Sequence, residues 1–480
     1  MSQSIFRNYI AGEWVEGTSS IENISPADLS DSIGHYAQAD EAQTLEAIDA
    51  AKIGQLEWQE SGLEQRYSVL MAIGDELIAR KDELGKLLAR EEGKTLAEGV
   101  GETYRSGQFF HYYAAEVLRQ MGETADSVRP GVEIQTHREP VGVVGIITPW
   151  NFPTATGAWK IAPALAFGNA IVFKPANQVP ASAWALTEII SRQGLPAGTF
   201  NLVMGPGAKV GDVLINSKKI NALTFTGSLE TGRKVAAATA VNLVKCQLEM
   251  GSKNALVVLD DADLDNAVEC AVGGAFFGTG HKCTASSRLI VTEGIHDKFV
   301  DTVIARMKQL VVGHPLKEGV HIGAVADARQ MKQNLDYLAI AKKEGATLAI
   351  GGEVINEETE GYYLQPALFT NTTNDMTINR EEAFAPIACV IKVKNYEEAL
   401  ATLNDTNYGL TGGICTQSLK HANDFKRRAE TGCVMINLPT AGTDYHVPFG
   451  GRKESSFGPR EQGSYAKEFY TIVKTTYMRS

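Results

Sequence analysis

Residues 141–153 read VGVVGIITPWNFP, a short apolar run that ends in a turn between prolines. Three further runs of this kind follow: NAIVFKPA (169–176), FNLVMGPG (200–207) and INALTFTGS (220–228). Helical stretches such as SAWALTEIISRQG separate them. Alternating strands and helices are typical of a parallel sheet covered on both faces, and such sheets bind ligands at the carboxyl ends of their strands. The pattern predicts an α/β domain with a ligand site in these loops.

A second series of short apolar runs begins near residue 254 and predicts a second α/β domain. Its members are NALVVLDD (254–261), SRLIVTEG (287–294), ATLAIGGE (346–353), ACVIKVKN (388–395) and GCVMINLP (432–439). Two other stretches, near 124–141 and 463–480, alternate apolar and polar residues and are too short to form a domain. We expect them to pair as a flap whose exposed edge a partner subunit covers.

Composition restricts the class of protein. The chain has 480 residues, so we expect more than one domain, and its formal charge of −12 argues against nucleic-acid or anionic-membrane partners. The sequence shows neither a signal peptide nor an apolar run long enough to span a bilayer. The six cysteines lack a CxxC pair, and the nine histidines lack metal-ligand spacing. We therefore expect a cytoplasmic protein without a metal site.

One cysteine stands in an unusual local context. The stretch GTGHKCTASSR (278–288) places Cys283 between a glycine-broken turn and small hydroxylated residues. Free cysteine is commonly a buried core residue. A thiolate beside unobstructed backbone is equally suited to act as a nucleophile. The local sequence leaves both interpretations open.

Two further residues could assist such a nucleophile. Asn151 lies between prolines, so its backbone cannot be regular helix, and a rigidly held amide is a good oxyanion donor. The same position also suits an ordinary turn residue. Glu249 ends an apolar run before a glycine-containing turn. It could be a general base if burial raises its pKa, or a solvated loop carboxylate.

Residues at the ends of predicted strands could bind a dinucleotide. Ser228, after Gly227, begins a helix whose N-terminus could hold a phosphate, or it is simply the cap of that helix. Lys174 follows a strand and could donate to ribose or phosphate, or lie on the surface. Gly207 and Gly211 are spaced one residue too far apart for a dinucleotide-binding fingerprint, so their signal is weak.

Together and in this order, these motifs resemble the aldehyde dehydrogenase superfamily along essentially the whole chain. The matching segments are PWNFP, FKPA, FTGS, LEMG, GHKCTASSR, EEAFAP and PFGG. The resemblance implies that the Cys283 thiolate attacks an aldehyde and that the Asn151 amide and the Cys283 backbone N–H stabilise the oxyanion. Hydride would then pass to a nicotinamide, and Glu249 would activate the water that releases the acid. A catalytically retired scaffold is the remote alternative.

The resemblance also implies an NAD(P) site. It assigns cofactor binding to Trp150, Lys174, Asn177, Gly207, Gly211, Gly227, Ser228, Glu382 and Phe384. The family commonly has a carboxylate three residues after the lysine of KPA, and that carboxylate disfavours a 2′-phosphate. Here the position is the neutral Asn177, so we expect NADP to be used as well as NAD. The chain differs from the usual family residues at Ser252, His281, Lys282 and Ala385, and none of these differences removes a catalytic group.

The same resemblance implies a domain organisation. Residues 1–123 and 142–251 would form a Rossmann-type cofactor domain, and residues 252–462 an α/β catalytic domain. Residues 124–141 and 463–480 would form a small β element used for oligomerisation. A homodimer or homotetramer follows.

The C-terminal sequence NLPTAGTDYHVPFGGRKESSFGPREQGSYAKEFYT resembles the members of the family that oxidise 2-oxoglutarate semialdehyde (2,5-dioxopentanoate). The remote carboxylate of that substrate requires a basic group, for which Arg119 is the candidate, although it could be a surface arginine. Succinate semialdehyde and an anhydro-sugar aldehyde are the alternatives. A sugar would need hydroxyl-binding groups, which could come from Thr154, Thr156, Tyr445 and His446.

Overall fold

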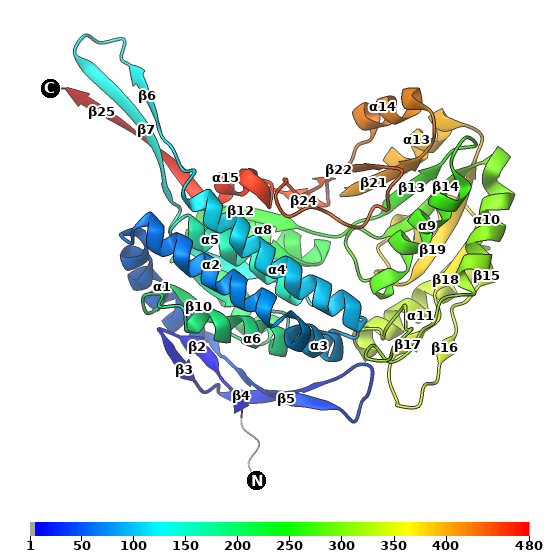
Figure 1. Ribbon diagram of the computed structural model, residues 1–480, viewed down its shortest axis with the longest axis horizontal. Coiled ribbons are helices and arrows are strands. Elements are labelled where there is room, and N and C mark those ends of the chain that lie inside the picture. The colour runs from blue at the N-terminus through cyan, green and yellow to red at the C-terminus, as the bar shows by residue number, and fades with distance from the viewer. Residues whose placement is uncertain (1–4, 480) are drawn as a thin grey trace.

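The computed structural model describes residues 5–479 and contains two large sheets, each flanked by helices, and a narrow β arm (Figure 1). In the first large sheet five parallel strands have the order β12-β11-β8-β9-β10. Their bounds are β8 (Val143–Ile147), β9 (Ala170–Lys174), β10 (Phe200–Leu202), β11 (Ala222–Thr226) and β12 (Lys245–Glu249). Antiparallel edge strands complete it: β2 (Asn8–Ile10), β3 (Glu13–Val15) and β24 (Ser456–Phe457). The strands predicted from the first series of apolar runs are therefore confirmed.

Both faces of this sheet are buried because its strands are apolar on both sides. Ile146 packs in a cluster with residues of α2, α4, α5 and α6, whereas Val143, three residues earlier in β8, packs with residues of α1, α7 and α8. This follows from the period of two in a strand. The helix bounds are α1 (Glu41–Gln59), α2 (Leu63–Ala79), α3 (Lys81–Glu92), α4 (Leu96–Val117), α5 (Pro153–Ala166), α6 (Pro180–Ser191), α7 (Asp212–Asn216) and α8 (Leu229–Asn242).

The second large sheet has seven strands in the order β15-β18-β19-β14-β13-β21-β22, parallel except for β15. Its strands are β13 (Asn254–Val258), β14 (Ser286–Thr292), β15 (Thr347–Ile350), β18 (Ala367–Thr372), β19 (Ile387–Val393), β21 (Thr411–Cys415) and β22 (Cys433–Ile436). Its helices are α9 (Leu264–Ala275), α10 (Glu293–Met307), α11 (Ala328–Lys343), α13 (Tyr396–Asn404) and α14 (Leu419–Arg428). The second α/β unit is thus present as predicted.

Strands from both alternating segments form the projecting arm of Figure 1, whereas residues 463–470 of the second segment are helical. Strand β7 (Val132–Pro140) pairs antiparallel with β6 (Glu123–Asp126) and with β25 (Thr471–Arg479). The register places Thr471 opposite Pro140 and Arg479 opposite Val132. The pairing expected from the alternation is confirmed, and the exposed apolar side chains of the arm include Ile472, Val473, Tyr477 and Met478.

Smaller elements connect these units. They are β1 (Ile5–Phe6), β4 (Ser19–Ile24), β5 (Ser32–Gln38), β16 (Val354–Ile355), β17 (Tyr363–Leu364), α12 (Thr377–Arg380), β20 (Tyr408–Gly409), β23 (Arg452–Lys453) and α15 (Lys467–Tyr470). Strand β24 pairs with β12, so the chain returns to the first sheet before residue 462. The division into domains proposed above stays a prediction.

Within residues 5–479, no helix has the length and apolar character needed to cross a bilayer.

Candidate active site

A cavity of about 930 Å³ is lined by loops that follow strands of the first sheet and by segments of the second α/β unit. The loops after β8, β11 and β12 all contribute, as expected for the carboxyl edge of a parallel sheet. Eight residues predicted for the site line this cavity: Trp150, Asn151, Thr156, Gly227, Ser228, Cys283, Glu382 and Phe384. Seven others do not: Arg119, Lys174, Asn177, Gly207, Gly211, Glu249 and His446.

Cys283 follows a tight turn in which Gly278, Thr279 and Gly280 all have left-handed backbone, with φ of 55° at Thr279. Gly278 and Gly280 have φ angles of 64° and 66°, in the left-handed region. A Cβ at Gly280 would also collide with the carbonyl oxygen of Ala385. Burial raises the pKa of the Cys283 thiol, and the negative charges of Glu249 and Glu382 raise it further. The thiol therefore needs a proton acceptor before it can attack a carbonyl.

Asn151 reaches the segment that carries this cysteine. Its Nδ2 donates to the carbonyl oxygen of His281 at 2.8 Å, and Asn151 is buried. An amide nitrogen has two hydrogens, so this bond leaves one for a substrate oxygen. The structure thus brings together two residues that are 132 positions apart in the chain (283 − 151).

Glu249 is buried at the end of β12, behind the lining of the cavity. Burial raises its pKa well above the ordinary value, and the carboxylate of Glu461 acts in the same direction. The hydroxyl of Ser456 opposes both by donating to Glu249 Oε2 at 2.5 Å. Gly450 passes so close that a Cβ there would lie 2.8 Å from Glu249 Oε1. The solvated-loop alternative for Glu249 is therefore wrong.

Two charged residues beside Glu249 were missed by the sequence analysis. Lys160 is fully buried in α5, and its ammonium group pairs with Glu461 and donates to Thr224 Oγ1 at 2.7 Å. Lys160 lies within an apolar helix and Glu461 within a polar C-terminal stretch, 301 residues apart. No local pattern marks either residue, because only the folded chain brings them into contact.

Glu382 and Phe384 also line the cavity. Glu382 Oε1 accepts from the backbone N–H of Ser252 at 2.8 Å, and burial raises the pKa of its carboxyl to about 7. Phe384 has a positive φ of 52° and lies edge-on to Trp150, with 5.5 Å between ring centroids. A flat ring could pack against these aromatic side chains, and the carboxylate could accept bonds from hydroxyl groups.

The other predicted cofactor residues surround the ends of β9 and β11. Lys174 is buried, which excludes the surface alternative and lowers the pKa of its ammonium group to about 8. Asn177 Oδ1 is buried without a partner within residues 5–479. A Cβ at Gly211 would lie 3.6 Å from Lys174 Cε. Ser228 Oγ accepts from the N–H of Thr231 at 3.3 Å, so Ser228 does cap α8.

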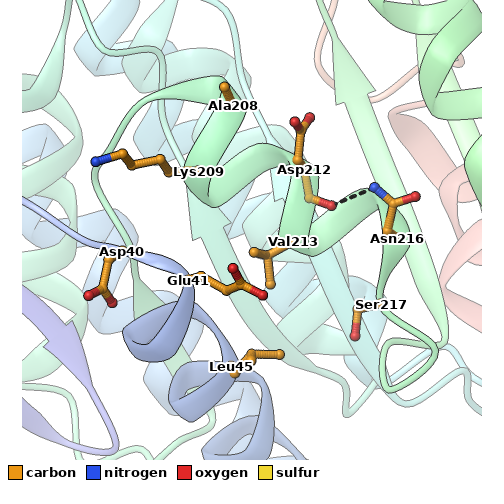
Figure 2. Close-up of a pocket in the computed structure, with 9 residues that line it drawn as sticks. All are labelled: Asp40, Glu41, Leu45, Ala208, Lys209, Asp212, Val213, Asn216 and Ser217. Carbon is orange, nitrogen blue, oxygen red and sulfur yellow. Dashed lines mark hydrogen bonds between the residues drawn. The ribbon is translucent and has the colours of Figure 1, made fainter.

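A second hollow, of about 600 Å³, lies between the start of α1 and the turn that contains Ala208 and Lys209 (Figure 2). Figure 2 shows Glu41 and Leu45 of α1 facing Val213 of α7 across it. It shares no lining residue with the larger cavity. Its lining contains the carboxylates of Asp40, Glu41 and Asp212 but no cysteine or histidine, and no cluster of such groups suited to a metal ion occurs within residues 5–479.

Arg119 and His446 lie outside the cavity. The guanidinium group of Arg119 is 62% exposed and pairs with Glu116 at 2.7 Å. His446 is exposed beside Tyr445. Arg105, which the sequence analysis did not consider, does not line the cavity either; it lies over the ring of Tyr445, 5.2 Å from its centroid.

Comparisons with known proteins identify the family of this chain. The model of the aldehyde dehydrogenase family matches residues 14–476. The alpha-ketoglutaric semialdehyde dehydrogenase of Bacillus subtilis (strain 168) is 42% identical over 484 residues, which cover 99% of each chain. The crystal structure of betaine aldehyde dehydrogenase from Staphylococcus aureus in complex with NAD+ superposes with a TM-score of 0.96 at 33% identity, covering 100% of this chain and 95% of that one.

A structure of 3,6-anhydro-L-galactose dehydrogenase with bound NADP also has a TM-score of 0.96, at 32% identity, covering 99% of this chain and 100% of that one. The chain belongs to the aldehyde dehydrogenase family. It is accordingly an oxidoreductase that acts on aldehydes with NAD or NADP, and the predicted fold, enzyme class and cofactor class are confirmed.

Proposed function

We propose that this enzyme oxidises 2-oxoglutarate semialdehyde to 2-oxoglutarate through a thioester on Cys283. The observation that carries the chemistry is the convergence of Cys283, Asn151 and Glu249. Asn151 bonds to the backbone just before Cys283, and the charge of Glu249 acts directly on the thiol. The substrate is supported by the 42% identity to the Bacillus subtilis alpha-ketoglutaric semialdehyde dehydrogenase.

The chain's own residues supply each proton and charge. Glu249 takes the thiol proton, directly or through a water, and the Cys283 sulfur adds to the aldehyde carbon. The resulting oxyanion accepts hydrogen bonds from Asn151 Nδ2 and the Cys283 N–H. After hydride loss, Glu249 releases the thiol proton to solvent and is again a carboxylate; water then attacks the thioester while Glu249 accepts its proton, and the thiolate leaves. Burial raises the pKa of Glu249, so its carboxylate, once ionised, is a stronger base than a solvated glutamate.

A dinucleotide fits the residues present. Asn177 Oδ1 and Thr226 Oγ1 are buried without partners within residues 5–479, and ribose hydroxyls or phosphate-bound waters would satisfy them. Lys174 would hold ribose or phosphate, Ser228 would lie against the pyrophosphate, and Glu382 would accept from the second ribose. The bound nicotinamide supplies the acceptor for the hydride. Gly227, Trp150 and Phe384 would shape the same pocket.

The recognition of the substrate carboxylate needs a cation near the cavity. The sequence suggested Arg119, but its exposure and its pairing with Glu116 give it no support. Arg105 is a better placed cation, because the Tyr445 ring beneath it packs on Phe109, with 6.3 Å between centroids. Phe109 in turn packs on Trp159, which lines the cavity with Cys283.

The test compares Arg105→Met and Arg119→Met. We expect Arg105→Met to lower kcat/KM for 2-oxoglutarate semialdehyde by roughly tenfold or more, the loss of about 1.4 kcal/mol of carboxylate recognition. Its kcat/KM for pentanal, a neutral aldehyde of equal chain length, should change little. Arg119→Met is the matched control. Equal losses on both aldehydes would refute the role of Arg105.

An anhydro-sugar aldehyde or succinate semialdehyde is the alternative substrate. The superposition on 3,6-anhydro-L-galactose dehydrogenase favours the sugar, and the buried Thr156 in the cavity could bind one of its hydroxyls. Thr154 is also buried, whereas His446 is exposed and would need to move inward. A kcat/KM that is highest for the neutral sugar would overturn the proposed substrate and leave the family assignment intact.

The proposal includes a cytoplasmic homodimer or homotetramer. The exposed apolar side chains on β25 would be covered by a partner subunit. It also keeps the domain division given above, with residues 124–141 and 463–480 as the oligomerisation element. Light scattering of Val473→Glu measures this directly: a monomer supports the assignment, and an unchanged assembly mass contradicts it.

A further inference from the structure

A buried lysine lies beneath the loop that carries Asn151. Lys94 stands between Gly93, which ends α3, and Thr95, which caps α4, and it is 4% exposed. Its ammonium group donates to the backbone oxygen of Asn151 at 2.6 Å. The same group donates to Glu102 at 2.6 Å and lies 4.1 Å from the ring centroid of Phe152. Lys94 thus touches both Asn151 and the residue after it.

Glu102 fixes the other end of this loop. Its Oε1 accepts from the backbone N–H groups of Thr154 and Ala155, both at 3.0 Å. These two groups belong to the first turn of α5, where backbone donors have no partner within the helix. One buried ion pair therefore holds the segment from Asn151 to Ala155 at both ends.

This arrangement is costly if its only purpose is stability. A buried ion pair loses hydration, and well-packed apolar residues of similar volume often stabilise a core as well or better. Burial lowers the pKa of Lys94, but the carboxylates of Glu102 and Glu92 raise it by more, so the ammonium group stays charged and remains a donor. A charged donor on the Asn151 carbonyl gives a directional restraint that apolar packing cannot give.

We propose that Lys94 is a positioning residue that holds the Asn151 amide where the oxyanion develops. The inference rests on the oxyanion role proposed for Asn151. Oxyanion donors act at a defined distance of 2.7–3.1 Å, and displacements of about 1 Å cost large factors in rate. Asn151 makes one further contact, to the carbonyl of His281, so Lys94 and the nucleophile segment together define the direction of the amide.

A double-mutant cycle tests the coupling. The variants are Lys94→Met, Asn151→Ala and their combination, and the readout is the single-turnover rate of cofactor reduction with saturating aldehyde and cofactor. We expect Asn151→Ala to slow this step by about 100- to 1,000-fold. Lys94→Met should slow the wild-type enzyme by roughly tenfold or more and the Asn151→Ala enzyme by less than about twofold. The Kd for the cofactor should stay within about twofold in each variant.

A merely structural role would not produce this pattern. Arg66→Met is the matched control, because Arg66 is also buried and donates to the backbone oxygens of Trp58 and Gln59, far from the loop in sequence. It should lower the melting temperature without changing the single-turnover rate. If Lys94→Met does not fold, Glu102→Gln carries the same test, because it keeps an acceptor for α5 and removes the charge that pairs with Lys94.

One outcome would refute the positioning role of Lys94, and a different outcome would refute the oxyanion role of Asn151. If Lys94→Met slows both backgrounds by the same factor, Lys94 does not act through Asn151 and the inference is overturned. If Asn151→Ala itself leaves the single-turnover rate unchanged, the oxyanion role of Asn151 in the proposed function fails. A tenfold effect that disappears in the Asn151→Ala background supports both.

Discussion

Replacing Ser456 with alanine removes the hydrogen bond that Glu249 Oε2 accepts at 2.5 Å. This bond lowers the pKa of Glu249, against burial and the charge of Glu461, which raise it. A hydrogen bond to a charged group contributes about 1.5–3 kcal/mol, and a change of one in a pKa corresponds to about 1.36 kcal/mol. We therefore expect Ser456→Ala to raise the pKa of Glu249 by about one to two.

The sign of the effect on rate follows from the role of a base. Glu249 accepts a proton only when it is ionised, so a higher pKa moves the rising part of the pH–rate profile to higher pH. At a pH below both pKa values, deacylation should slow by about tenfold each time the pKa of Glu249 rises by one. An activated ester such as p-nitrophenyl acetate acylates a cysteine without a cofactor. The initial burst of nitrophenolate then reports acylation, and the later linear phase reports deacylation.

Ser191 provides a matched control for the Ser456→Ala variant. Ser191→Ala removes a hydroxyl that donates only to the Glu188 carbonyl in α6, so its profile should match that of the parent enzyme. Ser456 Oγ also accepts from the Gly451 N–H at 2.6 Å, so a loss of about 1 kcal/mol of stability is expected and a melting curve will measure it. A deacylation profile that stays in place, or moves to lower pH, would refute the assignment of Glu249 as the base.

Three further results are expected. Asn177→Glu should lower the ratio of kcat/KM with NADP to kcat/KM with NAD by at least about tenfold, because a carboxylate repels a 2′-phosphate. An unchanged ratio in steady-state assays would show that Asn177 does not lie near that phosphate. Lys160→Met should lower the free energy of unfolding by roughly 3–5 kcal/mol, because it leaves the Glu461 carboxylate buried without its cation. Urea titrations measure this loss, and adding Glu461→Leu should restore most of it. The cofactor Kd should rise as the pH falls below about 7, where Glu382 becomes protonated, because a protonated carboxyl is a poor acceptor of hydrogen bonds from ribose hydroxyls. Fluorescence titrations measure the Kd, and the Glu382→Gln variant should show no such rise.

Much of the fold follows from local sequence, because strand and helix periods are local properties. Short apolar runs bounded by glycine and proline predicted β8 to β11 of the first large sheet and β13, β14, β19 and β22 of the second. The run at 346–353 forms β15, which is antiparallel, and no run predicted β18 or β21. The alternation near 124–141 and 463–480 predicted two segments that pair, and residues 132–140 and 471–479 do pair along their whole length, whereas residues 463–470 are helical. The order of motifs also predicted the family, which the match over residues 14–476 confirms.

The sequence by itself therefore determined many of the strands, the family and the identity of Cys283, Asn151 and Glu249 as candidates. Only the tertiary structure decided which charged residues lose their water. Lys94 and Lys160 look like surface lysines in the chain, yet both are buried against carboxylates, whereas Arg119, the predicted substrate residue, lies in solvent. The physical reason is that desolvation and ion pairing depend on neighbours that are up to 301 residues away, and a local pattern carries no information about such distant contacts.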